Sequence, residues 1–307
     1  MKPVNIGLLG LGTVGGGTAT VLQDNAAEIS RRLGREVRIS AVCDLSEEKA
    51  KQICPNAAFI KDPFELVQHQ DVDIVVELFG GTSIAKDAVL KAIENGKHIV
   101  TANKKLLAEY GNEIFPLAEE KNVMVQFEAA VAGGIPIIKA LREGLAANQI
   151  RSIAGIINGT SNFILTEMRE KGSAFADVLK EAQALGYAEA DPTFDIEGHD
   201  AGHKITIMSA LAFGTPMNFS ACYLEGISKL DSRDIKYAEE LGYRIKLLGI
   251  TRKTDKGIEL RVHPTLIPES RLLANVNGVM NAVRVNADMV GETLYYGAGA
   301  GALPTAS

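Results

Sequence analysis

A glycine pattern near the N-terminus constrains the fold of this chain more than any other feature. Residues 10–15 read Gly-Leu-Gly-Thr-Val-Gly, directly after the apolar run Val4 to Leu9 and directly before a helical segment. In that context the first glycine permits a tight turn, the second lets the backbone approach a pyrophosphate, and the third lets helix and strand pack closely. The motif therefore favours a strand, a dinucleotide-binding turn and a helix over an ordinary glycine-rich turn.

Composition narrows the class of protein further. The 307 residues are 46% hydrophobic and 23% charged, which is a globular composition long enough for two domains. A formal net charge of −6 argues against a general nucleic-acid binder. The cysteines, Cys43, Cys54 and Cys222, form neither a disulfide framework nor a metal-binding spacing. We expect a cytoplasmic protein, because the uncharged stretch from Pro3 to Gln23 is too rich in glycine for a membrane span or a signal peptide.

Short runs rich in valine and isoleucine alternate with helical stretches through the first 130 residues. The expected strands are Val4 to Leu9, Val37 to Cys43, Asp73 to Leu78, His98 to Ala102 and Val123 to Phe127. The expected helices are Gly17 to Leu33, Glu47 to Ile53, Ser83 to Glu94 and Lys105 to Lys121. This βαβ repetition predicts an α/β fold in which residues 1–130 form a Rossmann-type parallel sheet covered on both faces.

After Gly133 and Gly134 the pattern changes, and residues 131–307 are predicted to form a second α+β domain with a mixed sheet. Helices are expected near 162–171, 175–185 and 198–213, and strands near 151–157, 247–251, 258–263, 281–286 and 292–296. The glycine-rich end of the chain is expected to lack a terminating helix and to return to the first domain. We expect the substrate site to lie between the domains.

Side chains that follow parallel strands share one edge of the sheet, which points to candidate cofactor contacts. Asp44 ends the second expected strand and is placed to accept hydrogen bonds from the adenine ribose; equally, it would cap the helix that begins near Ser46. Lys104 follows the fourth expected strand and would lie beside the cofactor, with Thr101 or Asn103 as the helix cap.

The segment from Gly186 to Lys204 contains many of the ionisable side chains that are candidates for catalysis and substrate binding in the second domain. Glu197, Asp200 and Lys204 lie on one face of an expected helix, and beyond Lys204 this helix is apolar nearly all round. One interpretation is a surface ion pair between Asp200 and Lys204. Because the polar stripe stops where the helix becomes buried, we favour a cleft in which Lys204 transfers a proton and carboxylates hold a substrate ammonium group.

Two other patterns favour plain structural roles. His199 and His203 are one helical turn apart, but no third metal ligand accompanies them, so we expect both on a helix surface. The turn that begins at Asn158 runs into a helix for which Thr160 or Ser161 is the expected cap.

Several blocks in order resemble the homoserine dehydrogenase family over essentially the whole chain. The matching blocks are GLGTVG at 10–15, TANKK at 101–105, FEAAVAGGIPII at 127–138, INGTSNFIL at 157–165, the segment 189–204, and GETLYYGAGAGALPTA at 291–306. The resemblance implies an enzyme that interconverts L-homoserine and L-aspartate 4-semialdehyde with NAD or NADP, in the biosynthesis of threonine and methionine.

The resemblance also implies roles for individual residues. Lys204 is the expected acid–base catalyst, and Lys104 is expected to contact both substrate and cofactor. The implied cofactor contacts are Gly10, Gly12, Thr13, Val14, Gly15, Asp44, Thr82, Lys104 and Gly301. The implied substrate contacts are Gly186, Glu189, Asp195 and Asp200. A structural Na⁺ or K⁺ ion is expected at Glu128, Val131, Gly133 and Ile135, largely through backbone carbonyls.

Two features depart from the family pattern. Position 43 is a cysteine where many relatives carry an arginine that would meet a 2′-phosphate, so both NAD and NADP are candidate cofactors. The chain also ends where relatives continue with a helix and often with an ACT regulatory domain. Two alternative functions are another Rossmann oxidoreductase of a small amino or hydroxy acid and a non-catalytic dinucleotide sensor. We expect a small-molecule substrate, no nucleic-acid or membrane partner, and a homodimer formed through the second domain.

Overall fold

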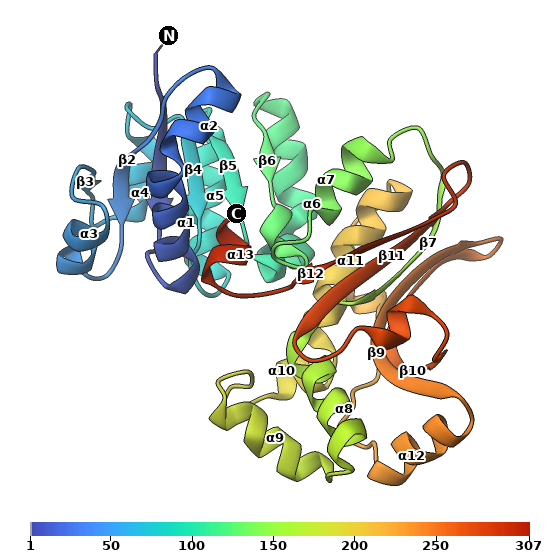
Figure 1. Ribbon diagram of the computed structural model, residues 1–307. Coiled ribbons are helices and arrows are strands. Elements are labelled where there is room, and N and C mark those ends of the chain that lie inside the picture. The colour runs from blue at the N-terminus through green and yellow to red at the C-terminus, as the bar shows by residue number, and fades with distance from the viewer. Residues whose placement is uncertain (1) are drawn as a thin grey trace. The chain divides into compact units, whose positions relative to one another are not determined.

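The computed structural model describes residues 2–307, and the contacts within it divide the chain into two compact units (Figure 1). The first unit runs through Gly134 and also includes Ala300–Ser307, while the second comprises Ile135–Gly299. The first unit thus extends past the limit predicted at residue 130, and it includes the last residues of the chain.

The first unit is built on a parallel sheet with the strand order β3-β2-β1-β4-β5-β6. Its strands are β1 (Val4–Leu9), β2 (Val37–Cys43), β3 (Ala58–Phe59), β4 (Ile74–Glu77), β5 (His98–Thr101) and β6 (Val125–Gln126). The order reverses between β1 and β4, which creates the switch point where ligands bind in sheets of this kind. The predicted Rossmann-type sheet is confirmed.

Helices cover the strands of this sheet. They are α1 (Thr13–Asp24), α2 (Ala26–Leu33), α3 (Glu47–Ile53), α4 (Pro63–Gln68), α5 (Ser83–Glu94), α6 (Lys104–Glu120) and α13 (Ala302–Ala306). Strand β1 is buried along its whole length, and Leu8, Leu11 and Val42 form part of the core beneath α1.

Three expectations for the first unit are wrong in detail. The single helix expected from 17 to 33 is two helices, α1 and α2, which meet at Asn25. Strand β3 and helix α4 were missed, because elements this short show no hydrophobic period. The end of the chain does form a helix, α13, which packs on α1 so closely that a Cβ on Gly17 would lie 2.6 Å from the Ala302 carbonyl oxygen.

The second unit is built on a mixed sheet, as predicted. Its strand order is β12-β11-β7-β9-β10-β8. Within this sheet of the described chain, β8 pairs with β10 in parallel and the other strand pairs are antiparallel. The strands are β7 (Ile150–Ile156), β8 (Tyr223–Leu224), β9 (Tyr243–Thr254), β10 (Gly257–Pro268), β11 (Met280–Ala287) and β12 (Glu292–Ala298).

Helices α8 and α11 pack against strands of this sheet, and α11 is buried on nearly all sides. The helices of the unit are α7 (Ile137–Lys139), α8 (Gly159–Lys171), α9 (Phe175–Ala184), α10 (Thr193–Ile196), α11 (His199–Phe213) and α12 (Ser232–Glu240). Among the helices formed by residues 2–307, none has both the length and the apolar character of a membrane span.

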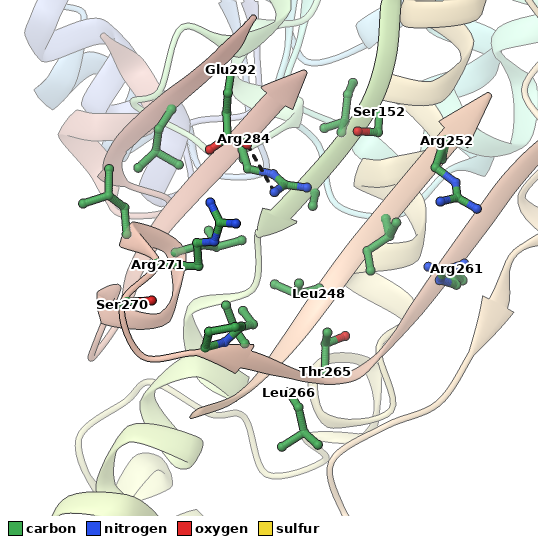
Figure 2. A pocket seen from close by; sticks show the side chains of 18 residues that line it. Ser152, Leu248, Arg252, Arg261, Thr265, Leu266, Ser270, Arg271, Arg284 and Glu292 are labelled. Atoms are coloured by element: carbon green, nitrogen blue, oxygen red, sulfur yellow. Dashed lines mark hydrogen bonds and ion pairs between the residues drawn. The ribbon is translucent and has the colours of Figure 1, made fainter. Parts of the chain in front are cut away.

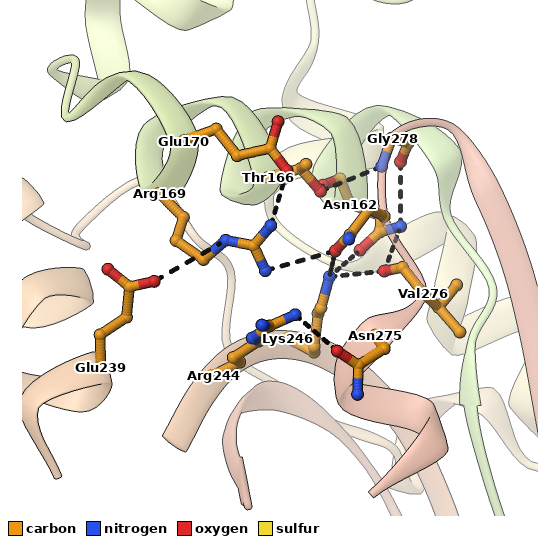
Figure 3. A network of polar contacts seen from close by, with 11 residues as sticks. Asn162, Thr166, Arg169, Glu170, Glu239, Arg244, Lys246, Asn275, Val276 and Gly278 are labelled. Carbon is orange, nitrogen blue, oxygen red and sulfur yellow. Dashed lines mark hydrogen bonds and ion pairs between the residues drawn. The ribbon is translucent and has the colours of Figure 1, made fainter. Parts of the chain in front are cut away.

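A buried polar network ties α8 to β9 and to the segment before β11 (Figure 3). Lys246 on β9 is 1% exposed, and its Nζ donates hydrogen bonds to Asn162 Oδ1 at 3.0 Å and to the Val276 carbonyl. The Asn162 amide nitrogen in turn donates to the carbonyls of Val276 and Gly278. Burial, together with the charges of Arg169 and Arg244, lowers the pKa of Lys246 to about 7.

The lowered pKa of Lys246 predicts how stability depends on pH. Between pH values of about 7 and 10.5 the unfolded chain holds a proton on Lys246 that the folded protein lacks, so the free energy of unfolding rises with pH. Replacement Lys246→Met removes this rise. Denaturation of both proteins at about pH 6 and about pH 9.5 should show wild type gaining stability relative to the variant.

The exposed Lys253 on the same strand supplies a matched control, since Lys253→Met should keep the wild-type dependence on pH. Equal pH dependence of wild type and Lys246→Met would contradict the assignment of a depressed pKa to Lys246.

Candidate functional site

The glycine turn lies at the carboxyl end of β1 and leads into α1. Gly10 has a φ of 94°, and a Cβ at this position would lie 2.9 Å from the Leu78 carbonyl oxygen. A Cβ on Gly15 would collide with the Gly10 carbonyl, whereas a Cβ on Gly12 would meet nothing within 4 Å. The first and third glycines are therefore required by packing, and the second leaves open space beside the backbone.

The N-terminus of α1 is suited to an anion. Gly12 is its N-cap and supplies no side-chain cap, and its first turn carries no acidic residue. Thr13 is exposed at this end and Val14 is half-buried. Helix N-terminal N–H groups without a side-chain cap carry a partial positive charge, which fits the pyrophosphate of a dinucleotide.

Asp44 holds the glycine turn through hydrogen bonds. Its carboxylate accepts hydrogen bonds from the backbone N–H groups of Leu11 at 2.7 Å and Ser46 at 3.0 Å. Helix α3 is capped by the Ser46 hydroxyl, which accepts from the Lys49 N–H, so the alternative that Asp44 caps this helix is wrong. Burial acts to raise the pKa of Asp44, but the backbone hydrogen bonds from Ser46, Leu11 and Leu45 and the charge of Lys49 together outweigh it, and the pKa is lowered.

Lys104 is the first residue of α6, at the carboxyl edge of the sheet. Asn103 is the cap, since its Oδ1 accepts from the Leu106 N–H at 3.1 Å. Thr82 is the N-cap residue of α5 and is half-buried, and Gly301 occupies the N-cap position of α13 with a φ of 118°.

The residues expected to hold a cation lie in an irregular segment. Glu128 begins a 3₁₀ turn, η1 (Glu128–Ala130), and Val131 follows it. Ala132 and Gly133 then have φ values of 57° and 47°, a left-handed backbone that is uncommon for alanine. Ile135 is the first residue of the second unit. No cluster of metal-ligating side chains is found among residues 2–307, so a cation here would depend on backbone oxygens.

Lys204 and Asp200 form a buried ion pair on α11. Lys204 Nζ lies 2.7 Å from Asp200 Oδ2, and the two side chains are only 11% and 4% exposed. The same Nζ donates a 2.7 Å hydrogen bond to the Ile157 carbonyl. The alternative of a surface ion pair is therefore wrong, and these charges are held out of bulk water.

Asn158 joins two of the predicted carboxylates, and sequence reasoning missed it. Its Nδ2 donates to Asp195 Oδ1 at 2.7 Å and to Asp200 Oδ2 at 2.9 Å. Its Oδ1 accepts from the Ser161 N–H, so Asn158 caps α8 and the expected caps Thr160 and Ser161 do not. Asparagine caps helices as well as serine does, and the sequence offered no signal to separate them.

The remaining predicted substrate residues are more exposed. Gly186 and Glu189 follow α9 and both are exposed, while the Glu189 carbonyl accepts a hydrogen bond from Gln183 Nε2. The Tyr187 carbonyl accepts the Thr160 hydroxyl at 2.6 Å, which ties this stretch to the start of α8. The structure thus gathers Asp195, Asp200 and Lys204 around Asn158.

The predicted placement of the histidines is wrong for one of them. His203 is 2% exposed, and its ring centroid lies 4.1 Å from that of Phe219 and 5.5 Å from that of Phe194. His199 is half-buried. The side of α11 that carries His203 is covered by the segment around Phe219, which has no periodic sequence pattern.

A separate groove of about 660 Å³ lies on the mixed sheet (Figure 2). Arginines are prominent in its lining, namely Arg252, Arg261, Arg271 and Arg284. None of the predicted site residues lines it. We therefore do not place the catalytic site in this groove, despite its size.

Comparisons with known proteins cover both units. Residues 136–307 match the family described as homoserine dehydrogenase, and residues 10–128 match its NAD-binding domain. The homoserine dehydrogenase of Neisseria gonorrhoeae is 92% identical over 100% of this chain and 71% of its own length. That of Pseudomonas aeruginosa is 63% identical, over 100% of this chain and 70% of its own length.

Comparison with solved structures leads to the same family. A homoserine dehydrogenase from Thiobacillus denitrificans superposes with a TM-score of 0.97 at 67% identity, covering 100% of this chain and 71% of that one. A hyperthermophilic archaeal homoserine dehydrogenase in complex with NADPH gives a TM-score of 0.82 at 30% identity, covering 99% and 94%. These relatives support the family interpretation over both alternative functions. The chain belongs to the homoserine dehydrogenase family, which comprises NAD(P)-dependent oxidoreductases of amino-acid biosynthesis.

Proposed function

We propose that Lys204 is the proton-transfer group of the homoserine dehydrogenase reaction. The supporting observation is its buried amine, held between the Asp200 carboxylate and the Ile157 carbonyl. When bound, the nicotinamide dinucleotide accepts or returns the hydride. Oxidation of the homoserine hydroxyl also releases a proton, which Lys204 would accept as a neutral amine after its resting ammonium has lost a proton to solvent, and Asp200 stabilises the ammonium that forms again. In the reverse direction the ammonium returns this proton to the alkoxide oxygen.

We assign the substrate ammonium group to the carboxylates of Glu189, Asp195 and Asp200, with Gly186 as a backbone contact. Asp200 contacts Lys204, Asn158 joins Asp195 to Asp200, and Glu189 is exposed. Asn158 supports the assignment because its amide donates to both aspartates and fixes their spacing. Carboxylate oxygens arranged in this way accept charge-assisted hydrogen bonds from an amine.

The dinucleotide is assigned to the first unit. The open space beside Gly12 and the uncapped N-terminus of α1 fit a pyrophosphate, and Thr13, Val14, Thr82, Lys104 and Gly301 are assigned as further contacts. Asp44 is assigned to the adenine ribose, and both NAD and NADP stay as candidates. The left-handed Ala132 and Gly133 support a Na⁺ or K⁺ ion at the carbonyls of Glu128, Val131, Gly133 and Ile135.

The thiols are assigned structural roles in a reducing, cytoplasmic compartment. Cys43, Cys54 and Cys222 are free cysteines. Burial raises the pKa of Cys43 to about 11 and that of Cys222 to about 12, which makes the nucleophilic thiolate rare. A covalent acyl-enzyme at these residues is therefore not part of the proposed reaction.

Removal of the Lys204 amine tests the proton-transfer role. In Lys204→Ala we expect kcat to fall by about 10²-fold or more, as for loss of a general acid–base group, while the dissociation constant of the cofactor stays close to that of wild type. Lys180→Ala, at an exposed position on α9, is the control. Unchanged turnover in the first variant would remove Lys204 from the mechanism.

The role of Glu189 predicts a different kinetic signature. Glu189→Gln keeps the size of the side chain but removes its charge, so the KM for homoserine should rise about tenfold or more, as for loss of one charge-assisted contact, and kcat should change less. Asp191→Asn removes an exposed carboxylate two residues further on and should leave KM unchanged. An unaltered KM in the first variant would show that the ammonium is bound elsewhere.

We further propose a homodimer that forms through the face of the mixed sheet that carries the groove. This face is hollowed, and it exposes Leu266 and Leu272 at 54% and 73%. Arg252 and Arg284 lie on it beside glutamates, at 2.9 Å from Glu259 and 3.3 Å from Glu292. Mixed apolar and paired charged groups suit a two-fold interface, in which the same surface meets itself.

Charged substitutions on this face test the dimer. Leu266→Asp combined with Leu272→Asp should convert a dimer into monomers in analytical ultracentrifugation, because each copy would bury two new carboxylates, four in the whole interface. Leu241→Asp, at a residue 72% exposed after α12, should leave the mass unchanged. A dimer that survives the double substitution would place the interface on another surface.

A further inference from the structure

A fully buried carboxylate lies at the switch point of the first sheet. Glu77, the last residue of β4, is 0% exposed, and its register partners are Leu9 on β1 and Thr101 on β5. The strand order reverses between β1 and β4, so Glu77 lies where a dinucleotide binds in such sheets. Burial of a carboxylate is costly without hydrogen-bond donors, and its donors therefore indicate its role.

One oxygen of Glu77 accepts a hydrogen bond from the loop after β4, and the other accepts one from the last residue of β5. Oε1 accepts from the Phe79 N–H at 2.9 Å, and Oε2 accepts from the Thr101 hydroxyl at 2.6 Å. The Thr101 oxygen in turn accepts from the Asn103 N–H at 3.0 Å. The backbone N–H groups of Phe79 and Asn103 can only donate, and the Thr101 hydroxyl donates to Glu77, so Glu77 is the final acceptor of the network.

Asn103 closes the connection between the two loops. Its Nδ2 donates to the Gly81 carbonyl at 2.8 Å, while its Oδ1 caps α6 at Leu106. The loop after β4 ends in Thr82, and α6 begins with Lys104. Two of the proposed cofactor contacts are thus attached to one network of hydrogen bonds that ends on Glu77.

Hydrogen bonds partly offset the effect of burial on Glu77. Burial raises the pKa of Glu77 above its usual value, and hydrogen bonds from Thr101, the Phe79 backbone and Asn103 limit this rise by stabilising the carboxylate. A glutamine at this position would present an amide NH₂ either to the Phe79 N–H or to the Thr101 hydroxyl. In the first case two donors face each other, and in the second the hydroxyl loses its acceptor.

We propose that Glu77 and Thr101 are positioning residues, which hold the loops after β4 and β5, and with them Lys104, in the arrangement that binds the nicotinamide cofactor. Neither side chain needs to touch the cofactor. This inference rests on the proposed function, in which Thr82 and Lys104 contact the dinucleotide.

A pair of substitutions at one residue tests the role. Thr101→Val keeps the shape and removes the hydroxyl, whereas Thr101→Ser keeps the hydroxyl. In fluorescence titrations with NADPH and with NADH, Thr101→Val should raise the dissociation constant of the preferred cofactor about tenfold, equivalent to about 1.4 kcal/mol. Thr101→Ser should stay within about twofold of wild type, and Glu77→Gln should resemble Thr101→Val.

Thr166→Val separates positioning from stability. The Thr166 hydroxyl is also buried and donates to the Asn162 carbonyl at 2.7 Å, but it lies in the second unit. Both valine variants should lower the melting temperature, and only Thr101→Val should weaken cofactor binding. If Thr101→Val loses stability and binds cofactor like wild type, the inference is overturned. Because Thr101→Val and Thr101→Ser are compared directly, the test stands even if Glu77→Gln does not fold.

Lys104→Ala distinguishes failure of the inference from failure of the proposed function. Impaired turnover and cofactor binding in Lys104→Ala, alongside wild-type binding in Thr101→Val, would refute only the positioning role. Wild-type behaviour of Lys104→Ala would refute the proposed cofactor contacts, and the inference with them.

Discussion

The burial of the Lys204 amine beside Asp200 is the interaction on which the second unit depends. A buried charge must be paired and hydrogen-bonded, because removing one partner leaves the other desolvated and alone. Here Lys204 also donates to the Ile157 carbonyl, directly after β7, and Asp200 accepts from the Asn158 amide at the start of α8. The elements that carry these groups cannot separate without exposing unpaired polar atoms. One requirement of electrostatics therefore fixes the place where the Lys204 amine and the carboxylates of Asp195 and Asp200 come together around Asn158.

In the first unit, hydrogen bonds between side-chain carboxylates and backbone N–H groups have a related role. A parallel sheet ends in loops whose N–H groups require acceptors, and here two acidic side chains supply them. Asp44 accepts from the glycine turn at Leu11, and Glu77 accepts from the loop after β4 at Phe79. The same loops leave the N-terminus of α1 open for an anion. Asp44 and Glu77 thus hold the backbone at the dinucleotide-binding edge of the sheet, while the glycines leave space there for the ligand.

Sequence patterns predicted the features that depend on local chemistry. The buried strand β1, the strand β2, the glycine turn and the apolar helix beyond Lys204 all follow from periodicity and steric requirements, and the structure has them. What the sequence did not reveal depends on tertiary contact. The cap of α8 was missed because Asn158, Thr160 and Ser161 are chemically equivalent candidates, and Lys246 was missed because a strand lysine is ordinarily exposed. Helix α13 is only a few residues long and depends on its packing against Gly17, which no local pattern records.

A crystal structure with L-homoserine and an oxidised nicotinamide cofactor bound tests the central claim most directly. The account predicts that the hydroxyl oxygen of homoserine lies within hydrogen-bonding distance of Lys204 Nζ, with the substrate ammonium against the neighbouring carboxylates. A complex in which Nζ keeps only Asp200 and Ile157 as partners, and the substrate hydroxyl faces a different side chain, would contradict it.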